Sequence, residues 1–288
     1  MVPRGKMANV TDRSTAPSFV LLTSGGIDGR RVASILHRSG ILYDLVLIAH
    51  PRRKKGRRSF LSYLPIWIRD HLAGFYLLRR LRQRKFPSYP VRGKFCGRVN
   101  SRRLKNYLSD LAPDYIIMMG GGILDDETIQ MATQGVLNVH PALLPWVRGV
   151  GVLLHSVARQ IPLGATGHFI DPGIDTGAII ARYKLPVLAD EQLGQIKKKS
   201  QRLCCAIMID LVRQAHEGFI LKGEPQTEKH DLCTTMPTED KQRITECIKN
   251  GEAARLYTAD FKGGTEKIED GTTLLEQYAN FLDDETSV

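Results

Sequence analysis

Phe19-Val-Leu-Leu-Thr-Ser-Gly-Gly-Ile-Asp-Gly-Arg-Arg-Val-Ala-Ser-Ile-Leu-His37 contains three patterns in succession. Residues 19–23 are apolar and favour a strand, residues 24–29 are rich in glycine, and residues 30–37 place their apolar side chains at helical spacing. The stretch therefore predicts a buried strand, a tight turn and a helix, which is the repeating unit of a parallel α/β sheet.

Further apolar runs repeat this unit along the chain. Residues 45–49, 115–119 and 135–140 predict three more strands, separated by helical stretches, and a long helix is predicted from Asp190-Glu191 to about Glu217. The expected fold is a Rossmann-like α/β fold with a mostly parallel sheet and helices on both faces. Ligand sites in such folds lie beyond the carboxyl ends of the strands.

Length and composition indicate how the chain is divided. The 288 residues are 42% hydrophobic and 25% charged, enough to bury a large core. We interpret residues 1–10 as a cloning remnant and disordered N-terminus, residues 17–222 as the main domain, and residues 223–288 as a small C-terminal extension. No run of about 20 apolar residues and no apolar leader occur, which predicts a cytoplasmic protein. The five cysteines lack regular spacing, which indicates a reducing compartment and no zinc site.

The positive charge is concentrated in one segment. Residues 51–105 hold 18 Lys and Arg against the single acid Asp70, whereas the rest of the chain carries 23 basic and 29 acidic residues. We interpret this segment as a basic helical insert. A protein that coats itself with nucleic acid spreads its charge more widely, so a local anionic partner is expected: a phosphate-bearing ligand, an anionic membrane surface or an RNA backbone, with nucleic acid least favoured.

Residues 59–85 within this insert allow two interpretations. One is an interfacial helix that would make the protein peripheral at the inner membrane face, with Phe60, Trp67, Phe75 and Tyr76 in the lipid and residues 79–85 on phosphates. The other is a helix that packs on the core and has a solvated, arginine-rich end. We favour the second, because amphipathic helices are far commoner in α/β folds than membrane-binding ones.

Two polar clusters can carry chemistry. Leu137-Asn-Val-His-Pro-Ala-Leu-Leu-Pro145 closes the fourth strand, where Asn138 and His140 point to the same face because they are two residues apart. An asparagine can donate to an oxyanion, and a histidine can act as a general acid or a second donor. The later loop of Asp171-Pro-Gly-Ile-Asp175 can bring a carboxylate to that imidazole. Taken singly, each of these residues is more often a structural hydrogen-bonding group.

In combination, Asn-x-His-Pro-x-Leu-Leu-Pro followed by Asp-x-Gly-x-Asp-Thr-Gly resembles the folate-dependent formyltransferases. This is the family of glycinamide ribonucleotide transformylase, methionyl-tRNA formyltransferase and the sugar N-formyltransferases, and the resemblance spans residues 19–220. It implies that residues 17–222 form a formyltransferase catalytic domain with 10-formyltetrahydrofolate as co-substrate and no metal. The family's catalytic residues fall on Asn138, His140 and Asp175.

The resemblance also implies the surrounding contacts. Folate-binding positions fall on Met119, Gly120, Gly121, Gly122, Ile123 and Leu124, with Asp171 and Gly173. Positions that bind the phosphate-bearing acceptor fall on Ser24, Gly25, Gly26, Arg30, Arg148 and His168. The alternatives are a turn-forming role for Asp171, a merely tight turn at residues 24–26, a surface arginine at 148 and a core histidine at 168.

The expected acceptor is an amino sugar carried on a nucleotide. Methionyl-tRNA formyltransferases add a β-barrel domain for which the tail after Gly223 is short, and Met236-Pro-Thr-Glu-Asp240 resembles a stretch of sugar-type relatives. Glycinamide ribonucleotide as acceptor, hydrolysis of 10-formyltetrahydrofolate, and a non-catalytic relative that binds membranes or RNA are the alternatives. The oligomeric state stays open, with a homodimer as one option.

Overall fold

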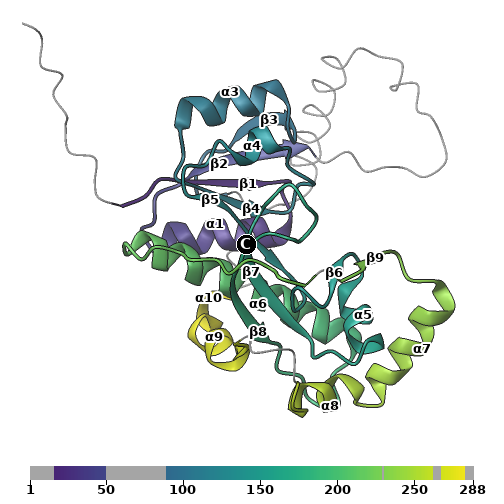
Figure 1. The fold of residues 1–288 in the computed structure, drawn as a ribbon. Helices are drawn as coiled ribbons and strands as arrows, with labels where there is room; N and C mark the ends of the chain where they lie inside the picture. The colour runs from purple at the N-terminus through teal and green to yellow at the C-terminus, as the bar shows by residue number, and fades with distance from the viewer. Residues whose placement is uncertain (1–15, 50–88, 229, 262–266, 283–288) are drawn as a thin grey trace, which may run out of the picture.

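The computed structural model describes residues 16–49, 89–228, 230–261 and 267–282 (Figure 1). The interpretations of residues 1–10 and of residues 59–85 fall outside these ranges. Within them, no helix combines the length and the apolar character that crossing a bilayer requires.

The core of the fold is a mixed sheet of eight strands. From one edge to the other they are β10 (Glu269–Asp270), β8 (Ile179–Lys184), β7 (Gly164–Phe169), β5 (Gly135–His140), β4 (Tyr115–Met119), β1 (Phe19–Thr23), β2 (Asp44–Ala49) and β3 (Lys94–Arg98). Five of the seven pairings are parallel, and only β7 runs against its neighbours β5 and β8. The prediction of an α/β fold with a mostly parallel sheet is thereby confirmed.

Helices cover both faces because the central strands are buried on both sides. In β1, Phe19 and Leu21 pack in the apolar cluster of α1 (Ile27–Arg38) and α6 (Leu193–His216). Their neighbours Val20 and Leu22 pack in the opposite cluster, which contains Leu104 and Leu108 of α3 (Arg102–Leu111). A strand between two helical layers needs apolar residues at every position, which explains the unbroken apolar run at 19–22.

The C-terminal extension is more closely joined to the main domain than expected. Strand β10 pairs with β8 in the main sheet, and β9 (Leu232–Cys233) pairs with β6 (Arg148–Gly149). The remaining helices are α4 (Asp126–Ile129), α5 (Val152–Ala158), α7 (Thr238–Lys249), α8 (Glu252–Thr258), α9 (Gly271–Gln277) and α10 (Ala279–Leu282). The described residues 223–228, 230–261 and 267–282 therefore pack on the main domain and add β10 to the edge of its sheet (Figure 1).

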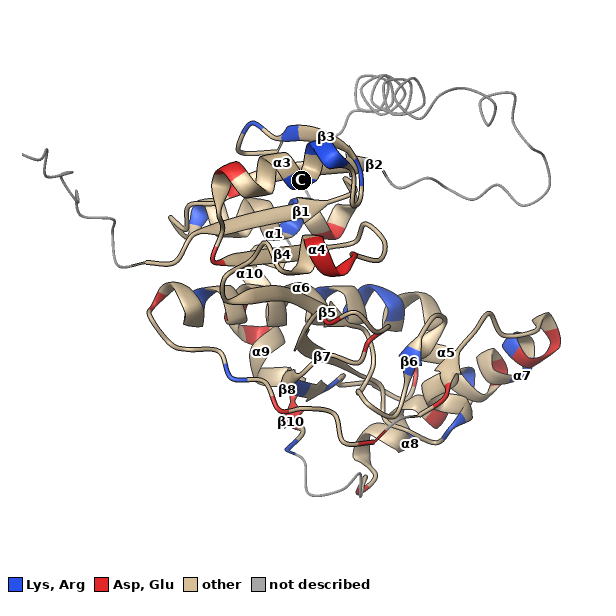
Figure 2. Cartoon of the chain, turned by 45° about the horizontal axis from the view of Figure 1, so that its top comes forward, with Lys and Arg blue, Asp and Glu red and all other residues tan. Residues whose placement is uncertain are grey.

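Two predicted boundaries change. Residues 94–98 were expected in the basic helical insert, but they form the edge strand β3, and the basic side chains that follow lie on α3 (Figure 2). An edge strand tolerates charged residues because one of its sides faces solvent. The long helix begins at Leu193 and not at Asp190, because Gln192 is its N-cap: the Gln195 side chain accepts from the Gln192 N–H at 2.8 Å.

Gly164 marks a tight contact between the sheet and the loop after β5. A Cβ atom there would lie 2.5 Å from the Tyr183 carbonyl oxygen and 2.5 Å from Leu143 Cδ2. We predict that Gly164→Ala lowers the free energy of unfolding by about 1–3 kcal/mol, because a buried backbone has to move. Gly194→Ala is the matched control: a Cβ atom there meets nothing within 4 Å, and alanine favours helix. Urea unfolding measures both variants, and equal stability of the two would contradict this account of the packing.

Candidate functional site

The carboxyl end of β5 carries a group of polar side chains on one face of the sheet. The antiparallel register pairs Asn138 with His168 and His140 with Thr166. The register between β7 and β8 pairs Thr166 with Arg182. Side chains directly opposite each other on neighbouring strands point to the same face. Three strands therefore bring these polar groups together, in the place where α/β folds carry their ligand sites.

His140 is buried and has an acceptor at each ring nitrogen. Its Nδ1 lies 3.4 Å from Asp175 Oδ1, and its Nε2 lies 3.0 Å from the carbonyl oxygen of Val147. A carbonyl oxygen can only accept, so Nε2 carries a hydrogen. The carboxylate is an acceptor as well, so an imidazolium ring satisfies both partners. The structure thus brings His140 and Asp175 together, as the sequence predicts.

Asp175 is held in an uncommon backbone conformation. Its φ of 53° lies in the left-handed region, and its Oδ2 accepts from the backbone N–H of Gly149 at 2.9 Å. Burial favours a higher pKa for this carboxyl, but the bond and charge of His140 and the Gly149 N–H outweigh it and lower the pKa below its usual value. Strand β9 packs closely on Gly149: a Cβ there would lie 2.5 Å from the Cys233 carbonyl oxygen.

Asn138 is oriented by a second histidine. Its Nδ2 lies 3.1 Å from His168 Nε2, while His168 Nδ1 lies 2.7 Å from the carbonyl oxygen of Phe169. Since that carbonyl can only accept, Nδ1 carries the hydrogen and Nε2 accepts from the Asn138 amide. Burial, and then the charge of His140, lowers the pKa of His168 to about 4, so the ring is neutral near pH 7.

This arrangement favours the core-histidine alternative for His168, and its contact with the acceptor stays a prediction. The side chain is only 2% exposed, and both of its ring nitrogens are engaged by Asn138 and Phe169. Its effect is to fix the Asn138 amide with Nδ2 toward β7. One N–H of Asn138 Nδ2 is then used by His168, and the second N–H makes no hydrogen bond with the residues that the structure describes.

Two buried residues that the sequence did not single out hold the loop after His140. Thr166 Oγ1 accepts from the Leu144 N–H at 3.0 Å and donates to the Ala142 carbonyl at 2.8 Å. Arg182 Nε donates to the Leu144 carbonyl at 2.7 Å. Thr166 lies two residues before His168, so strand alternation would have placed it on the same face. Arg182 could be found only from the register between β7 and β8.

The predicted folate segment lies at the carboxyl end of β4, next to β5. Gly120, Gly121 and Gly122 all have positive φ, and a Cβ at Gly121 would lie 2.5 Å from Ile48 Cδ1. Gly120 and Gly122 are exposed, which allows a flat ring to approach the backbone closely. The carbonyl oxygens of Met119, Gly120 and Ile123 accept from Thr23, Ser24 and Asn100, while Leu124 is buried.

The predicted acceptor segment lies at the amino end of α1. Gly26 is the N-cap of that helix, and Gly25 has a φ of 83°. The Arg30 side chain is buried, which lowers the pKa of its guanidinium. Arg148 is half-buried on β6, directly before Gly149, and its Nε has no hydrogen-bond partner among the described residues.

Asp171 shapes the loop that carries Asp175. Its Oδ1 accepts from the Gly173 N–H at 3.1 Å and from the Thr176 hydroxyl at 2.7 Å. At Gly173, a Cβ would lie 1.9 Å from Thr176 Oγ1, so the turn requires glycine. These contacts give Asp171 and Gly173 the turn-forming role; their contact with folate stays a prediction.

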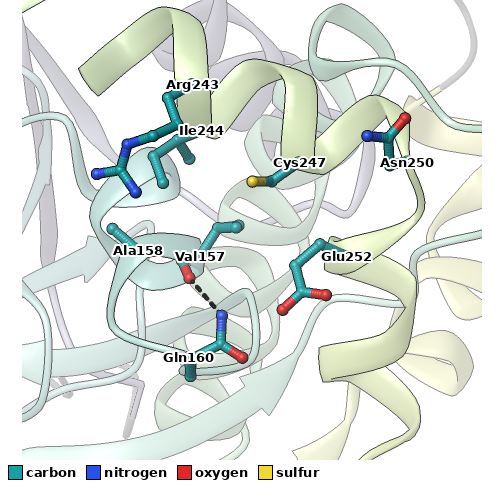
Figure 3. A pocket seen from close by; sticks show the side chains of 8 residues that line it. All are labelled: Val157, Ala158, Gln160, Arg243, Ile244, Cys247, Asn250 and Glu252. Carbon is teal, nitrogen blue, oxygen red and sulfur yellow. Dashed lines mark hydrogen bonds between the residues drawn. The ribbon is translucent and has the colours of Figure 1, made fainter. Parts of the chain in front are cut away.

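A separate hollow of about 270 Å³ lies between α5, α7 and α8 (Figure 3). Its charged groups are already paired: Arg243 with Asp240 at 3.1 Å, and Glu252 with Arg255 at 2.8 Å. The bond from Arg255, followed by that from Gln160, lowers the pKa of Glu252 to about 2. Among the residues that the structure describes, no cluster of His, Cys, Asp or Glu could hold a metal ion.

The low pKa of His168 predicts a pH effect on stability. Between pH 6.5 and 4 the unfolded chain protonates this histidine and the folded protein does not, so stability falls as the pH falls through this window. His168→Gln cannot titrate. The loss of unfolding free energy from pH 7 to pH 4 should therefore be smaller in this variant, by up to about 3 kcal/mol. Urea unfolding at both pH values tests this, with the exposed His37→Gln as control; equal losses in wild type and His168→Gln would contradict it.

Comparison with known proteins shows which family the chain is similar to. Residues 80–212 match the model of the formyl transferase family. The chain is 26% identical over 200 residues to a methionyl-tRNA formyltransferase of Alkaliphilus metalliredigens, covering 68% of this chain and 58% of that protein. It spans 52% to 65% of the length of this protein and of two further methionyl-tRNA formyltransferases.

Two solved structures share the fold, each with a TM-score of 0.51. One is glycinamide ribonucleotide transformylase 1 of Symbiobacterium toebii, at 19% identity, covering 73% of this chain and 92% of that one. The other is a sugar N-formyltransferase of a Shewanella species, at 14% identity, covering 81% and 87%. Through the match at residues 80–212, the chain is similar to the formyl transferase family over just under half of its length.

Proposed function

We propose that this protein transfers a formyl group from 10-formyltetrahydrofolate to a primary amine of a phosphate-bearing acceptor. The observation that carries the proposal is the buried pair of His140 and Asp175 next to Asn138, at the carboxyl end of β5. The similarity of residues 80–212 to the formyl transferase family supports the co-substrate, and the exposed glycine backbone at Gly120 and Gly122 fits a flat pterin ring.

Each of the three side chains has a role that follows from its contacts. 10-Formyltetrahydrofolate supplies the formyl group when bound. Asn138 donates its second Nδ2 N–H to the negative charge that develops on the formyl oxygen, because the first N–H is taken by His168. His140, held between two acceptors, contributes positive charge beside that oxygen. Asp175 keeps His140 charged and helps a water carry the proton from the attacking amine to the folate nitrogen, which departs as the amine of tetrahydrofolate when its bond to the formyl carbon breaks.

Replacing these side chains tests the roles directly. We predict that Asn138→Ala, His140→Ala and Asp175→Ala each lower kcat by at least about a hundredfold, because an oxyanion donor or the charge behind it is lost. Circular dichroism verifies that each variant folds, and Asp190→Ala, an exposed aspartate, is the control for Asp175→Ala. Turnover close to wild type in all three variants would sink the catalytic assignment.

For the acceptor we propose an amino sugar carried on a nucleotide. The turn at residues 24–26, with backbone N–H groups at the start of α1, suits a phosphate, and Met236-Pro-Thr-Glu-Asp240 is similar to sugar-type relatives. The rival acceptor is methionyl-tRNA, which is favoured by the sequence similarity to methionyl-tRNA formyltransferases.

A comparison of acceptors decides between them. Release of tetrahydrofolate is followed with a UDP-linked amino sugar, glycinamide ribonucleotide and methionyl-tRNA in parallel. We expect kcat/KM for the UDP-linked amino sugar to exceed the others by at least about tenfold, because a site built for one acceptor leaves polar groups unpaired with another. Preference for either of the other acceptors would overturn the amino-sugar proposal alone. Release of tetrahydrofolate in the absence of any acceptor would indicate a hydrolase. If no tetrahydrofolate is released under any condition, the proposal of formyl transfer is overturned.

A further inference from the structure

The chain that follows the main domain runs directly along the loop that carries Asp175. Glu224 and Ile179 exchange two backbone hydrogen bonds of 2.8 Å, which fix the chain beside the start of β8. Two residues later, Gln226 Nε2 donates to the carbonyl oxygen of Asp175 at 3.2 Å and to that of Gly177 at 2.7 Å. One side-chain amide therefore binds two carbonyls of the Asp175 loop.

The other end of this segment is attached to the strand that holds the Asp175 carboxylate. Strand β9 pairs with β6, and the Val150 N–H donates to the Cys233 carbonyl at 3.0 Å. Gly149 in β6 is the residue whose N–H binds Asp175 Oδ2. His155 Nε2 of α5 donates to the Thr234 carbonyl at 2.9 Å and fixes the exit of the segment. We call residues 224–228 and 230–233 the strap.

Asp175 needs such support because its backbone is strained. A residue other than glycine in the left-handed region keeps that conformation only when its surroundings hold it there. On one side the loop is held by Gly177, where a Cβ would lie 1.9 Å from the Phe169 carbonyl oxygen. On the other side the carbonyls of Asp175 and Gly177 point to Gln226, which is half-buried and supplies both N–H groups.

We propose that Gln226 is a positioning residue: its amide holds the backbone of the Asp175 loop so that the carboxylate faces His140, and the strap makes the C-terminal extension part of the reaction site. Gln226 acts through Asp175 and need not touch a substrate. The expected effect of Gln226 on turnover rests on the proposed function, whereas its expected effect on the position and pKa of the Asp175 carboxyl does not.

The test compares Gln226→Ala, Gln226→Glu and the control Thr227→Ala, an exposed neighbour on the strap. Carbon-13 NMR follows the titration of the Asp175 carboxyl. Its pKa should rise in both Gln226 variants, because the bonds from His140 and Gly149 weaken when the loop moves, and it should be unchanged in Thr227→Ala. Gln226→Glu separates a space-filling role from a hydrogen-bond donor role. Glutamate fills the same space, but it places a carboxylate against the two carbonyl oxygens to which glutamine donates.

The expected kinetic result is a split between kcat and KM. kcat for formyl transfer should fall about tenfold in Gln226→Ala and further in Gln226→Glu, with the KM for 10-formyltetrahydrofolate within about twofold of wild type. An unchanged Asp175 titration in both variants, or a Gln226→Glu variant that behaves as wild type, would overturn the proposal. If the wild-type protein transfers no formyl group to any acceptor, the proposed function fails, and the Asp175 titration still decides the role of Gln226.

Discussion

The contact between His140 and Asp175 is the constraint on which the rest of the site depends. It joins a strand in the middle of the sheet to a loop between two antiparallel strands, and both groups are largely buried. A buried charged pair is stable only when its remaining polar atoms are also satisfied. The Val147 carbonyl satisfies the far nitrogen of the ring, and the Gly149 N–H satisfies the second carboxylate oxygen. Val147 and Gly149 both follow β5 in the chain, so the segment that leaves the site at His140 has to fold back against His140 and Asp175.

The same requirement explains the polar residues that lie in the sheet behind the pair. Thr166 and Arg182 are almost fully buried, and their bonds go to the backbone between Ala142 and Leu144. His168 is neutral because it is buried beside a positive charge, and a neutral ring can accept from Asn138. Such a network specifies one arrangement only when all of its members are paired. Folding and the orientation of the site thus rest on the same hydrogen bonds.

The sequence was sufficient for the central strands and for the shared face of Asn138 and His140, because apolar runs and the two-residue alternation are local properties. It did not reveal β3, since Lys94-Phe-Cys-Gly-Arg98 is a charged edge strand within a basic segment. Nor did it reveal Arg182 or Gln226, whose roles depend on strand register and on a segment about fifty residues beyond Asp175. The sequence also did not reveal the contact of His168 with Asn138, because this pairing follows only once β7 is known to run antiparallel.

The similarity of residues 80–212 to the formyl transferase family connects this geometry to formyl transfer. We propose that Asn138 and His140 enclose the place where the formyl group is transferred. A crystal structure with bound tetrahydrofolate tests that claim most directly. The account predicts that the folate nitrogen that carries the formyl group lies within about 4 Å of the Asn138 or His140 side chain. A pterin bound at another edge of the sheet, with that nitrogen out of reach of both side chains, would contradict it.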